Sequence, residues 1–568
     1  MSSNEDSKSG QQPGGYADAE ANFQPKSPKF WLVVSGMFIS IFLVSLDRTI
    51  IATAIPSITD EFGSINDIGW YGSAYMLTCA SFNPVFGRIY QIYSTKWTFL
   101  ASLVVFEAGS ALCGAAATST AFIVGRAIAG LGSAGIFSGG MMIVISLVPL
   151  RKRPIFTSFF GMTFAISSVI APIIGGAFTD NLTWRWCFYL NLPIGGFTVL
   201  AVLLFFNVQS PPRERKGIKD QILRLDPLGV FLFVPSIISL ILALEWGGST
   251  YAWSDAKMIG LLVTFAVLLV AFIVFEVLTP ETAMVPTRVV LNRSIAGSML
   301  FVFLISAVMM SIVYYINIWF QVVKGDTATH AGISTIPMVL ALVIASFISA
   351  FATQRIGYYV PSMLLSPILF SIGAGLLSTL APNSNHRYWM GYQVLFGLGI
   401  GTGFQTANLS AQTVLPRPDV PLGMALMFFC QQLGGAVFLA IDQNLLTTKL
   451  VQHLSHVHGL DARGVVSSGA TNLRNIVPPD QLTTVVNAYN YAITYIFMVT
   501  AAVGACAILG TLVVEWRSIK TAGKKGPELH NKATGESRSE TASGHGLESD
   551  VGSHSGNQNT HAKEKLDV

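Results

Sequence analysis

Apolar residues in this chain gather into long, nearly uninterrupted runs instead of alternating with polar residues. Between residues 30 and 514 there are about fourteen such runs of roughly twenty residues each. A helix of that length crosses the hydrocarbon layer of a bilayer, so each run predicts a membrane-spanning helix. The predicted spans are 30–55, 69–90, 97–117, 122–148, 155–179, 186–206, 226–245, 257–277, 295–320, 331–351, 359–380, 388–411, 421–445 and 491–514.

The composition agrees with a membrane protein. Hydrophobic residues fill 52% of the 568 positions and charged residues only 11%, whereas a soluble domain is about one quarter charged. These values exclude a soluble protein and leave little chain for a catalytic domain. The sequence contains no phosphate-binding GxxxxGK[ST] loop, and its spans offer neither a nucleophile paired with a base nor clustered metal ligands. We therefore expect no enzymatic activity, no cofactor and no metal.

The distribution of basic residues predicts the orientation of the chain. If residue 1 lies inside, the inside loops receive Arg151, Lys152 and Arg153 and five basic residues between 213 and 224. The outside loops receive mainly Lys324, Arg387, Lys449, Arg463 and Arg474. The positive-inside rule then places both termini in the cytosol, as an even number of spans also requires. The net charge of +4 is thus a topology signal, and we expect no nucleic-acid partner.

The segments outside the spans are polar. Residues 1–29 and 515–568 lack the apolar residues that a folded core needs, so they are predicted to be disordered cytosolic tails. Residues 446–490 form a predicted long outer loop. Its histidines, at 453, 456 and 458, have no acid or cysteine at ligand spacing, which favours a solvated loop over a metal site. Asn181 begins a glycosylation acceptor pattern close to the membrane.

Charged residues inside the spans are the strongest functional signal. Each costs about 3 kcal/mol to insert at mid-helix and is kept where the interior of the bundle receives it. The deep candidates are Asp47, Arg48, Glu107, Arg126, Glu245 and Asp442. Arg126 is predicted to pair with a carboxylate across the bundle, and a buried carboxylate can carry a proton. A static ion pair is the alternative, or, for Arg48 and Glu245, a side chain that reaches the membrane interface.

Small residues mark predicted helix contacts. Gly130, Gly132 and Gly135 spell GxGxxG, but they lie inside an apolar span without the preceding strand that a dinucleotide site requires, so close helix packing is favoured. Pro172, followed by Gly175 and Gly176, predicts a bend in the fifth span that serves either as a hinge or as a static kink.

Taken in order, several strings resemble the major facilitator superfamily, and specifically its fourteen-span drug:proton antiporters of fungi. The first span carries Leu46-Asp47-Arg48-Thr49-Ile50-Ile51, similar to the family motif LDxTIV. The fourth carries Gly125-Arg126 followed by Gly130 and Gly132, and the fifth ends its motif at Pro172-Ile-Ile-Gly175-Gly176. The sixth opens on Trp184-Arg185-Trp186-Cys187-Phe188-Tyr189-Leu190-Asn191-Leu192-Pro193, similar to WRWxFxxNxP.

The resemblance implies an all-α membrane transporter that works by alternating access. Two six-helix bundles, at 30–206 and 295–514, would flank two inserted helices within 207–294. Asp47 and Arg126 would take part in proton coupling. Gly130, Gly132, Pro172, Gly175 and Gly176 would serve helix packing and conformational change.

The chain also departs from the family pattern. Ser167 and Ala171 replace usual glycines of the fifth-span motif, which weakens the case for export over import. The loop after the second span keeps Gly87, Arg88 and Lys96 as a cytoplasmic gate, but the usual aspartate is Gln91 and the second glycine is Ser94.

We therefore expect a monomeric plasma-membrane exporter that uses protons to move amphipathic small molecules, such as drugs, toxins or secondary metabolites, across the lipid bilayer. Candidate residues of the substrate cavity are Glu245, Tyr314, Tyr315, Gln405, Gln431, Gln432 and Asp442. The alternatives are a siderophore:proton symporter, or a basic amino acid transporter of the vacuolar membrane. A non-transporting membrane receptor is a less favoured third.

Overall fold

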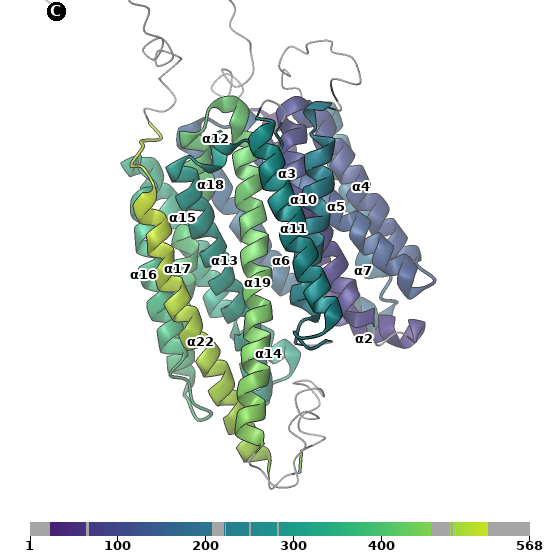
Figure 1. Ribbon diagram of the computed structural model, residues 1–568, viewed down its shortest axis with the longest axis vertical. Helices are drawn as coiled ribbons and strands as arrows, with labels where there is room; N and C mark the ends of the chain where they lie inside the picture. The colour runs from purple at the N-terminus through teal and green to yellow at the C-terminus, as the bar shows by residue number, and fades with distance from the viewer. Residues whose placement is uncertain are drawn as a thin grey trace, which may run out of the picture. The chain divides into compact units, whose positions relative to one another are not determined.

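Helices make up nearly all of the ordered structure in the computed structural model of the protein (Figure 1). The structure describes residues 23–63, 67–206, 221, 223–248, 251–280, 283–455, 477–478 and 481–520. Within these residues, β-structure is limited to two isolated bridges, Gly247 with Tyr251 and Tyr358 with Ser518. The prediction of an all-α chain is confirmed.

The helices follow one another with short connections. The first group comprises α2 (Pro28–Phe62), α3 (Ile68–Ile92), α4 (Thr95–Ala115), α5 (Ser119–Leu147), the 3-10 turn η2 (Leu150–Lys152), α6 (Arg153–Asn181), α7 (Trp186–Tyr189) and α8 (Asn191–Phe205). Two helices follow, α10 (Pro227–Trp246) and α11 (Ala256–Leu278). The remaining elements are α12 (Thr287–Val290), α13 (Arg293–Trp319), the π-helical turn η3 (Phe320–Lys324), α14 (Ala328–Ser334), α15 (Ile336–Ile356), α16 (Val360–Leu377), α17 (His386–Gly403), α18 (Thr406–Val414), η4 (Arg417–Asp419), α19 (Val420–Leu454) and α22 (Leu482–Val513).

Every predicted span coincides with one helix or with two consecutive helices. Among the described residues, 11 helical segments are both long enough and apolar enough to cross a membrane. The predicted spans 69–90, 155–179 and 388–411 correspond to α3, α6 and α17 with α18, which are outside that set. The chain is a multi-pass membrane protein, and the exact number of crossings stays a prediction.

The span predicted at 388–411 is not one continuous helix. Helix α17 ends at Gly403 and α18 begins at Thr406, with Phe404 and Gln405 in the turn between them. Glycines at 401 and 403 stand next to the break, and glycine weakens a helix interior. Interrupted helices commonly line the central sites of transporters, so this break marks a place of interest.

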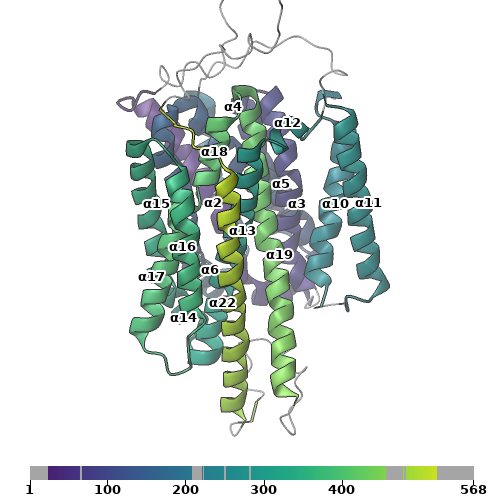
Figure 2. The same cartoon turned by 60° about the vertical axis from the view of Figure 1, so that its left-hand side comes forward.

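The predicted outer loop 446–490 is wrong at both of its ends. Helix α19 continues to Leu454 and α22 starts at Leu482, so both project beyond the neighbouring helices (Figure 2). Leu446, Leu450 and Leu454 recur every fourth residue and are buried, which is the periodicity of a helix with one apolar face. Polar residues on the other faces lower the mean hydropathy of this stretch, so the span predicted from hydropathy ends at residue 445. His453 belongs to this extension, whereas His456 and His458 lie outside the described residues.

The described C-terminal segment is held against the helices. Residues 515–520 continue from α22: the N–H of Ile519 donates to Gly357 O at 2.9 Å, and Arg293 pairs with Glu515 at 2.7 Å. Hydrogen bonds from Arg293 and then Arg517 hold the pKa of Glu515 below its ordinary value. The predicted C-terminal tail is therefore ordered over its first residues, and its remainder lies outside the described residues.

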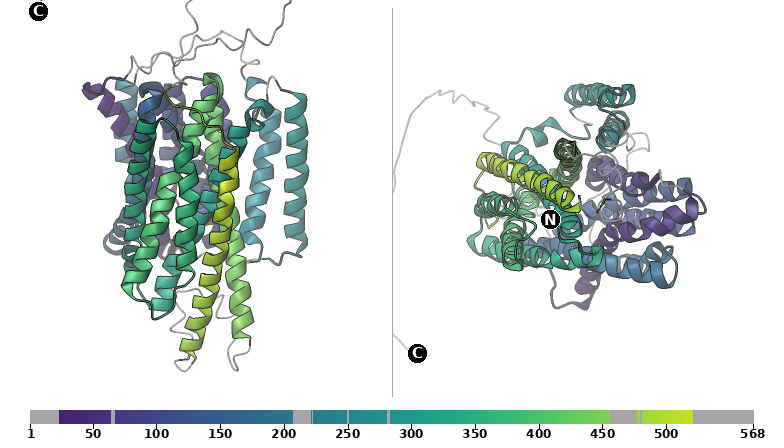
Figure 3. Two further views of the ribbon diagram at one scale, coloured as in Figure 1. Left: turned by 90° about the vertical axis from the view of Figure 1, so that its left-hand side faces the viewer. Right: turned by 90° about the horizontal axis from the view of Figure 1, so that it is seen from below.

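Helices α2 to α8 pack mainly among themselves, as do α13 to α22. The two groups meet where α3 packs on α19 and where α6 packs on α15. Helices α10 and α11 lie side by side at the edge of this assembly, and α10 reaches α3 and α19 (Figure 3). Only 11% of the apolar stretch of α11 is buried, as expected for a helix that faces lipid. The domain boundaries stay predictions.

Candidate functional site

A buried ion pair lies at the centre of the first helix group. Arg126 of α5 and Asp47 of α2 approach to 2.6 Å, between Nη1 and Oδ2, and their side chains are 1% and 0% exposed. The predicted partnership of Arg126 with a carboxylate across the bundle is thus found in the structure. A charge sequestered this deeply is stable only when paired and hydrogen-bonded.

Two residues of α3 also contact Arg126. Its Nε donates to Tyr71 O at 2.9 Å, and its guanidinium carbon lies 4.5 Å from the centre of the Tyr75 ring. Both tyrosines belong to α3 and are buried. A cation over an aromatic face is stabilised by the ring's negative face, so α3 helps to hold the arginine.

Asn191 completes the surroundings of Asp47. Its Nδ2 lies 3.3 Å from Asp47 Oδ1 and 3.1 Å from Ser110 Oγ of α4. Asn191 starts α8 and is fully buried. It stands in the WRWxFxxNxP string of the sequence, but no role was predicted for it, nor for Tyr71, Tyr75 or Ser110. A neutral amide within an apolar run was the signal that could have found Asn191.

Glycines allow the helices to approach closely around the ion pair. A Cβ atom at Gly130 would overlap Tyr75 O and the Thr78 hydroxyl of α3, and one at Gly132 would overlap the backbone of Phe106 in α4. Gly175 lies equally tightly against Thr53 of α2. Gly176 differs, because a Cβ there would meet nothing within 4 Å. Pro172 lies within the helical backbone of α6.

Two cavities open between the helix groups. The larger, of about 370 Å³, is bordered by α2, α3, α10, α13 and α19. The smaller, of about 60 Å³, is richer in aromatic rings and reaches the break between α17 and α18. Of the predicted cavity residues, these line one or both: Glu245, Tyr314, Gln405, Gln431 and Gln432.

Arg48 connects the two groups across these cavities. It borders both, and its Nη1 donates to Gln432 Oε1 of α19 at 3.2 Å. The interpretation that Arg48 reaches the membrane interface is wrong, because the residue points into the interior. Arg48 follows Asp47 directly in α2, so the cavity wall and the ion pair share one helical turn.

The other predicted cavity residues, Tyr315 and Asp442, are absent from the lining of these two cavities. Tyr315 is fully buried, and its hydroxyl donates to Gln443 Oε1 at 3.3 Å. Asp442 is 1% exposed. Within the described part of the chain, its carboxylate oxygens and those of Glu107 lack hydrogen-bond partners.

At the end where α3 finishes, the two helix groups are in contact. A Cβ at Gly87 would overlap Ala425 of α19. The Nε2 of Gln91 lies 3.1 Å from Asp419 Oδ1, and Arg288 reaches the same oxygen at 3.0 Å. Arg88 donates to Arg224 O and to Gln91 Oε1, and Lys96 donates to Leu203 O.

The C-terminal end of α2 is hydrogen-bonded to the segment that carries the WRWxFxxNxP string. Glu61 accepts hydrogen bonds from Trp184 at 2.7 Å and from Arg185 at 2.8 Å. These bonds, that of Arg185 foremost, hold the pKa of Glu61 below its ordinary value. Asn181 is exposed at the end of α6, and its Nδ2 donates to Ala177 O at 3.0 Å.

Comparison with known proteins finds transporters with similar sequences. The chain is 48% identical to the MFS-type efflux pump MFS1 of Trichophyton rubrum over 499 residues, which cover 88% of this chain and 93% of that protein. It is 43% identical to the efflux pump aflT of Aspergillus parasiticus, with 88% and 98% covered. The MFS-type transporter VdtG of Byssochlamys spectabilis is 46% identical over 88% of this chain and 90% of that protein.

Solved structures show the same fold at low identity. The human organic anion transporter MFSD10 aligns with a TM-score of 0.55 at 13% identity, covering 84% of this chain and all of that one (100%). The proton:xylose symporter XylE aligns with a TM-score of 0.55 at 14% identity, covering 87% and 98%. The sequence profile of the Major Facilitator Superfamily matches residues 37–439. From this profile and from relatives that match over most of their length, we conclude that the chain belongs to the Major Facilitator Superfamily of membrane transporters.

Proposed function

We propose that the protein exports amphipathic organic compounds across the plasma membrane in exchange for protons. The observation that carries this proposal is the buried pair of Asp47 and Arg126 one residue away from Arg48, which borders both central cavities. A protonatable group and a substrate cavity on one helical turn give the two ligands a route to influence each other.

Protonation of Asp47 would change the forces at the centre of the bundle. The neutral carboxyl no longer attracts the guanidinium strongly, while Arg126 keeps the carbonyl of Tyr71 and the ring of Tyr75. The link between α2 and α5 therefore weakens when the proton binds and strengthens when it leaves. A cycle that protonates Asp47 from outside and deprotonates it inside converts the proton gradient into alternation between two conformations.

The chemistry of the cavities suits an amphipathic organic substrate. Their walls combine Met310, Phe428 and Tyr314 with the amides of Gln431 and Gln432. Apolar contacts supply affinity, and the few amides orient polar substituents of the ligand. The larger cavity, at about 370 Å³, falls within the range of about 300–1,000 Å³ usual for sites that bind drug-sized molecules.

The direction of transport is inferred from relatives. The proteins of Trichophyton rubrum and Aspergillus parasiticus are named efflux pumps. These names favour export over the siderophore and vacuolar import alternatives. If both termini lie in the cytosol, as proposed, the contacts among Gln91, Arg288 and Asp419 would close the cytosolic side.

The test is accumulation of fluorescent or toxic amphiphiles in cells that express the protein at their surface. We expect lower accumulation than in cells without it, and loss of the difference in Asp47→Asn or with a protonophore. Asp60→Asn is the matched control, since Asp60 is an exposed carboxylate of the same helix. Normal export by the Asp47→Asn variant, or export that survives the protonophore, would refute proton coupling through this residue.

A further inference from the structure

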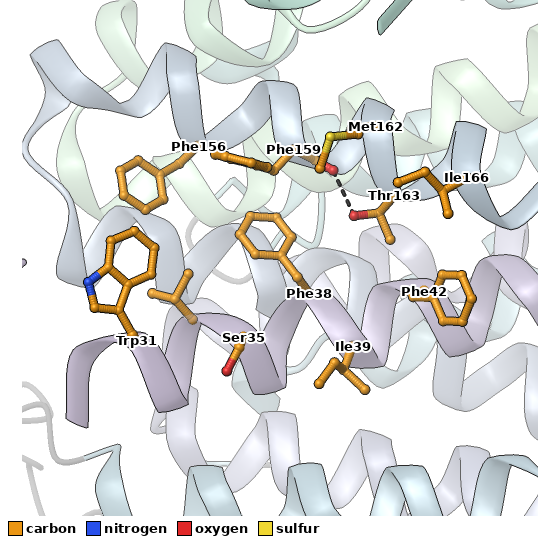
Figure 4. Close-up of a pocket in the computed structure, with 11 residues that line it drawn as sticks. Trp31, Ser35, Phe38, Ile39, Phe42, Phe156, Phe159, Met162, Thr163 and Ile166 are labelled. Carbon is orange, nitrogen blue, oxygen red and sulfur yellow. Dashed lines mark hydrogen bonds between the residues drawn. The ribbon is translucent and has the colours of Figure 1, made fainter. Parts of the chain in front are cut away.

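A groove between α2 and α6 faces away from the central cavities. The first turns of both helices lie side by side and enclose about 320 Å³ (Figure 4). Aromatic side chains dominate its wall, with Trp31 and Phe156 stacked at one end and Phe38 opposite Phe159 in the middle. None of these residues takes part in the ion pair or borders the central cavities described above.

The groove offers a ligand hydrocarbon surface and little else. Its two hydroxyl groups are already used: Ser35 donates to Leu32 O at 3.2 Å and Thr163 to Phe159 O at 2.7 Å. Trp31 and Ile166 are 50% and 43% exposed, so the groove is open along its side. In a membrane, the open side of the groove faces lipid, because the hydrocarbon layer around a membrane-spanning helix contains no water.

Basic residues surround the end where both helices begin. Lys152 Nζ lies 4.1 Å above the ring of Phe23, and that ring is 6.5 Å from the ring of Phe156. Three further cations are exposed in the same two chain segments: Lys26, Lys29 and Arg151. Residues 23–31 and 149–156 contain no acidic residue. The mouth of an apolar groove is therefore positively charged.

We propose that this groove binds an anionic phospholipid of the cytosolic leaflet. One acyl chain lies against Phe38, Ile39 and Phe159, and the headgroup phosphate and carboxylate are held by Lys152, Arg151 and the lysines that precede Trp31. The combination of an apolar slot with a basic mouth at the membrane surface is the chemistry that recognises such lipids. The proposal rests on the cytosolic placement of residue 23 proposed above, and on no part of the transport cycle.

Photoactivatable lipids test the site directly. The purified protein is placed in nanodiscs that contain phosphatidylserine or phosphatidylcholine with a diazirine in the acyl chain, and labelled peptides are mapped by mass spectrometry. We expect phosphatidylserine to label the segments 31–42 and 156–166 more than phosphatidylcholine does. The ratio of phosphatidylserine labelling to phosphatidylcholine labelling should fall about fivefold for each contributing basic residue that is removed.

The double variant Arg151→Gln/Lys152→Gln should lose most of this preference. Arg355→Gln/Arg417→Gln removes the same charge from exposed positions of the second helix group and should leave it unchanged. A second variant, Ser35→Phe, fills the groove and should lower labelling by both lipids. Equal labelling of the wild type by both lipids would overturn the proposal. Because labelling needs no transport, failure of the proposed export leaves this test intact.

Discussion

At the scale of single residues, the central feature is an ion pair that no solvent reaches. The pair of Asp47 and Arg126 is held by a short contact and by neighbours from two other helices, α3 and α8. Burial makes each partner depend on the other, because a lone charge in this environment has neither water nor a counterion. The ion pair therefore stabilises the bundle while Asp47 is ionised and weakens when Asp47 is protonated.

Removing the cation should destabilise the protein strongly. Arg126→Gln leaves the Asp47 carboxylate with the amide of Asn191 as its remaining side-chain partner, and we expect a loss of about 3–5 kcal/mol. Arg185→Gln is the comparison, because it breaks an ion pair with Glu61, whose side chain is 47% exposed; we expect a loss of about 0–1 kcal/mol. Thermal unfolding in detergent measures both. Similar shifts in the two variants would contradict the argument from burial.

Residue identity predicted part of this site. Asp47 and Arg126 stand out in the sequence because an ionisable side chain in an apolar span is rare and needs a partner. Asn191 carries only the weaker signal of a neutral amide in an apolar run, and a tyrosine such as Tyr75 carries none. Their contribution depends on where α8 and α3 place them, which no local pattern encodes.

At the scale of helices, the arrangement depends on how closely α3, α4 and α5 approach. Gly130 and Gly132 permit backbone contact that any side chain would prevent. In lipid, such packing replaces the hydrophobic effect as the force that joins helices. The chain thus uses small residues where the ion pair requires neighbouring helices to lie near.

Alanine substitutions at two glycines should act in opposite directions. Gly130→Ala forces α3 and α5 apart and should lower stability by about 1–3 kcal/mol, the usual effect of overpacking. Gly176→Ala has free space and should be neutral or raise stability by about 0.5–1 kcal/mol, because alanine favours the helix. The unfolding temperatures of the two variants, compared with that of the wild type, measure both effects. A loss of the same size in both would show that helix contact is not the reason.

Hydropathy predicted where helices exist better than where they end. Each predicted span coincides with one helix or with two consecutive helices, because a run of about twenty apolar residues is a strong signal. Hydropathy missed the break at Phe404 and Gln405, because the break leaves the mean hydropathy unchanged. It also missed the extension of α19 to Leu454, because only one residue per helical turn is apolar and buried there.

At the scale of the whole molecule, function depends on contacts between distant parts of the chain. Gln91 and Asp419 are separated by 328 positions, and Arg48 and Gln432 by 384. Nothing in either local sequence predicts these pairings. The sequence pointed to the gate through Gly87, Arg88 and Lys96, whereas the carboxylate that joins the two groups here is Asp419.

Breaking the Asp419 contacts should open the end of the molecule where α3 finishes. Asp419→Ala removes hydrogen bonds to Gln91 and Arg288, and each bond to a charged group contributes about 1.5–3 kcal/mol. A change of that size shifts the ratio of two conformations by about 10- to 150-fold. Spin labels at positions 151 and 355 report the separation of the two groups. We expect a longer distance to become more populated, and an unchanged distribution would rule out a closing role for Asp419.

In the proposed cycle, protons and substrate are exchanged through Asp47. The most direct measurement uses purified protein in liposomes with an imposed pH gradient, a fluorescent amphiphile that the cell assay has identified, and a pH-sensitive dye. We expect that adding the amphiphile drives a proton flux opposite to its own movement, that Asp47→Asn abolishes both, and that Asp60→Asn preserves both. Amphiphile movement by Asp47→Asn at the wild-type rate, or movement without any proton flux, would rule out exchange through Asp47.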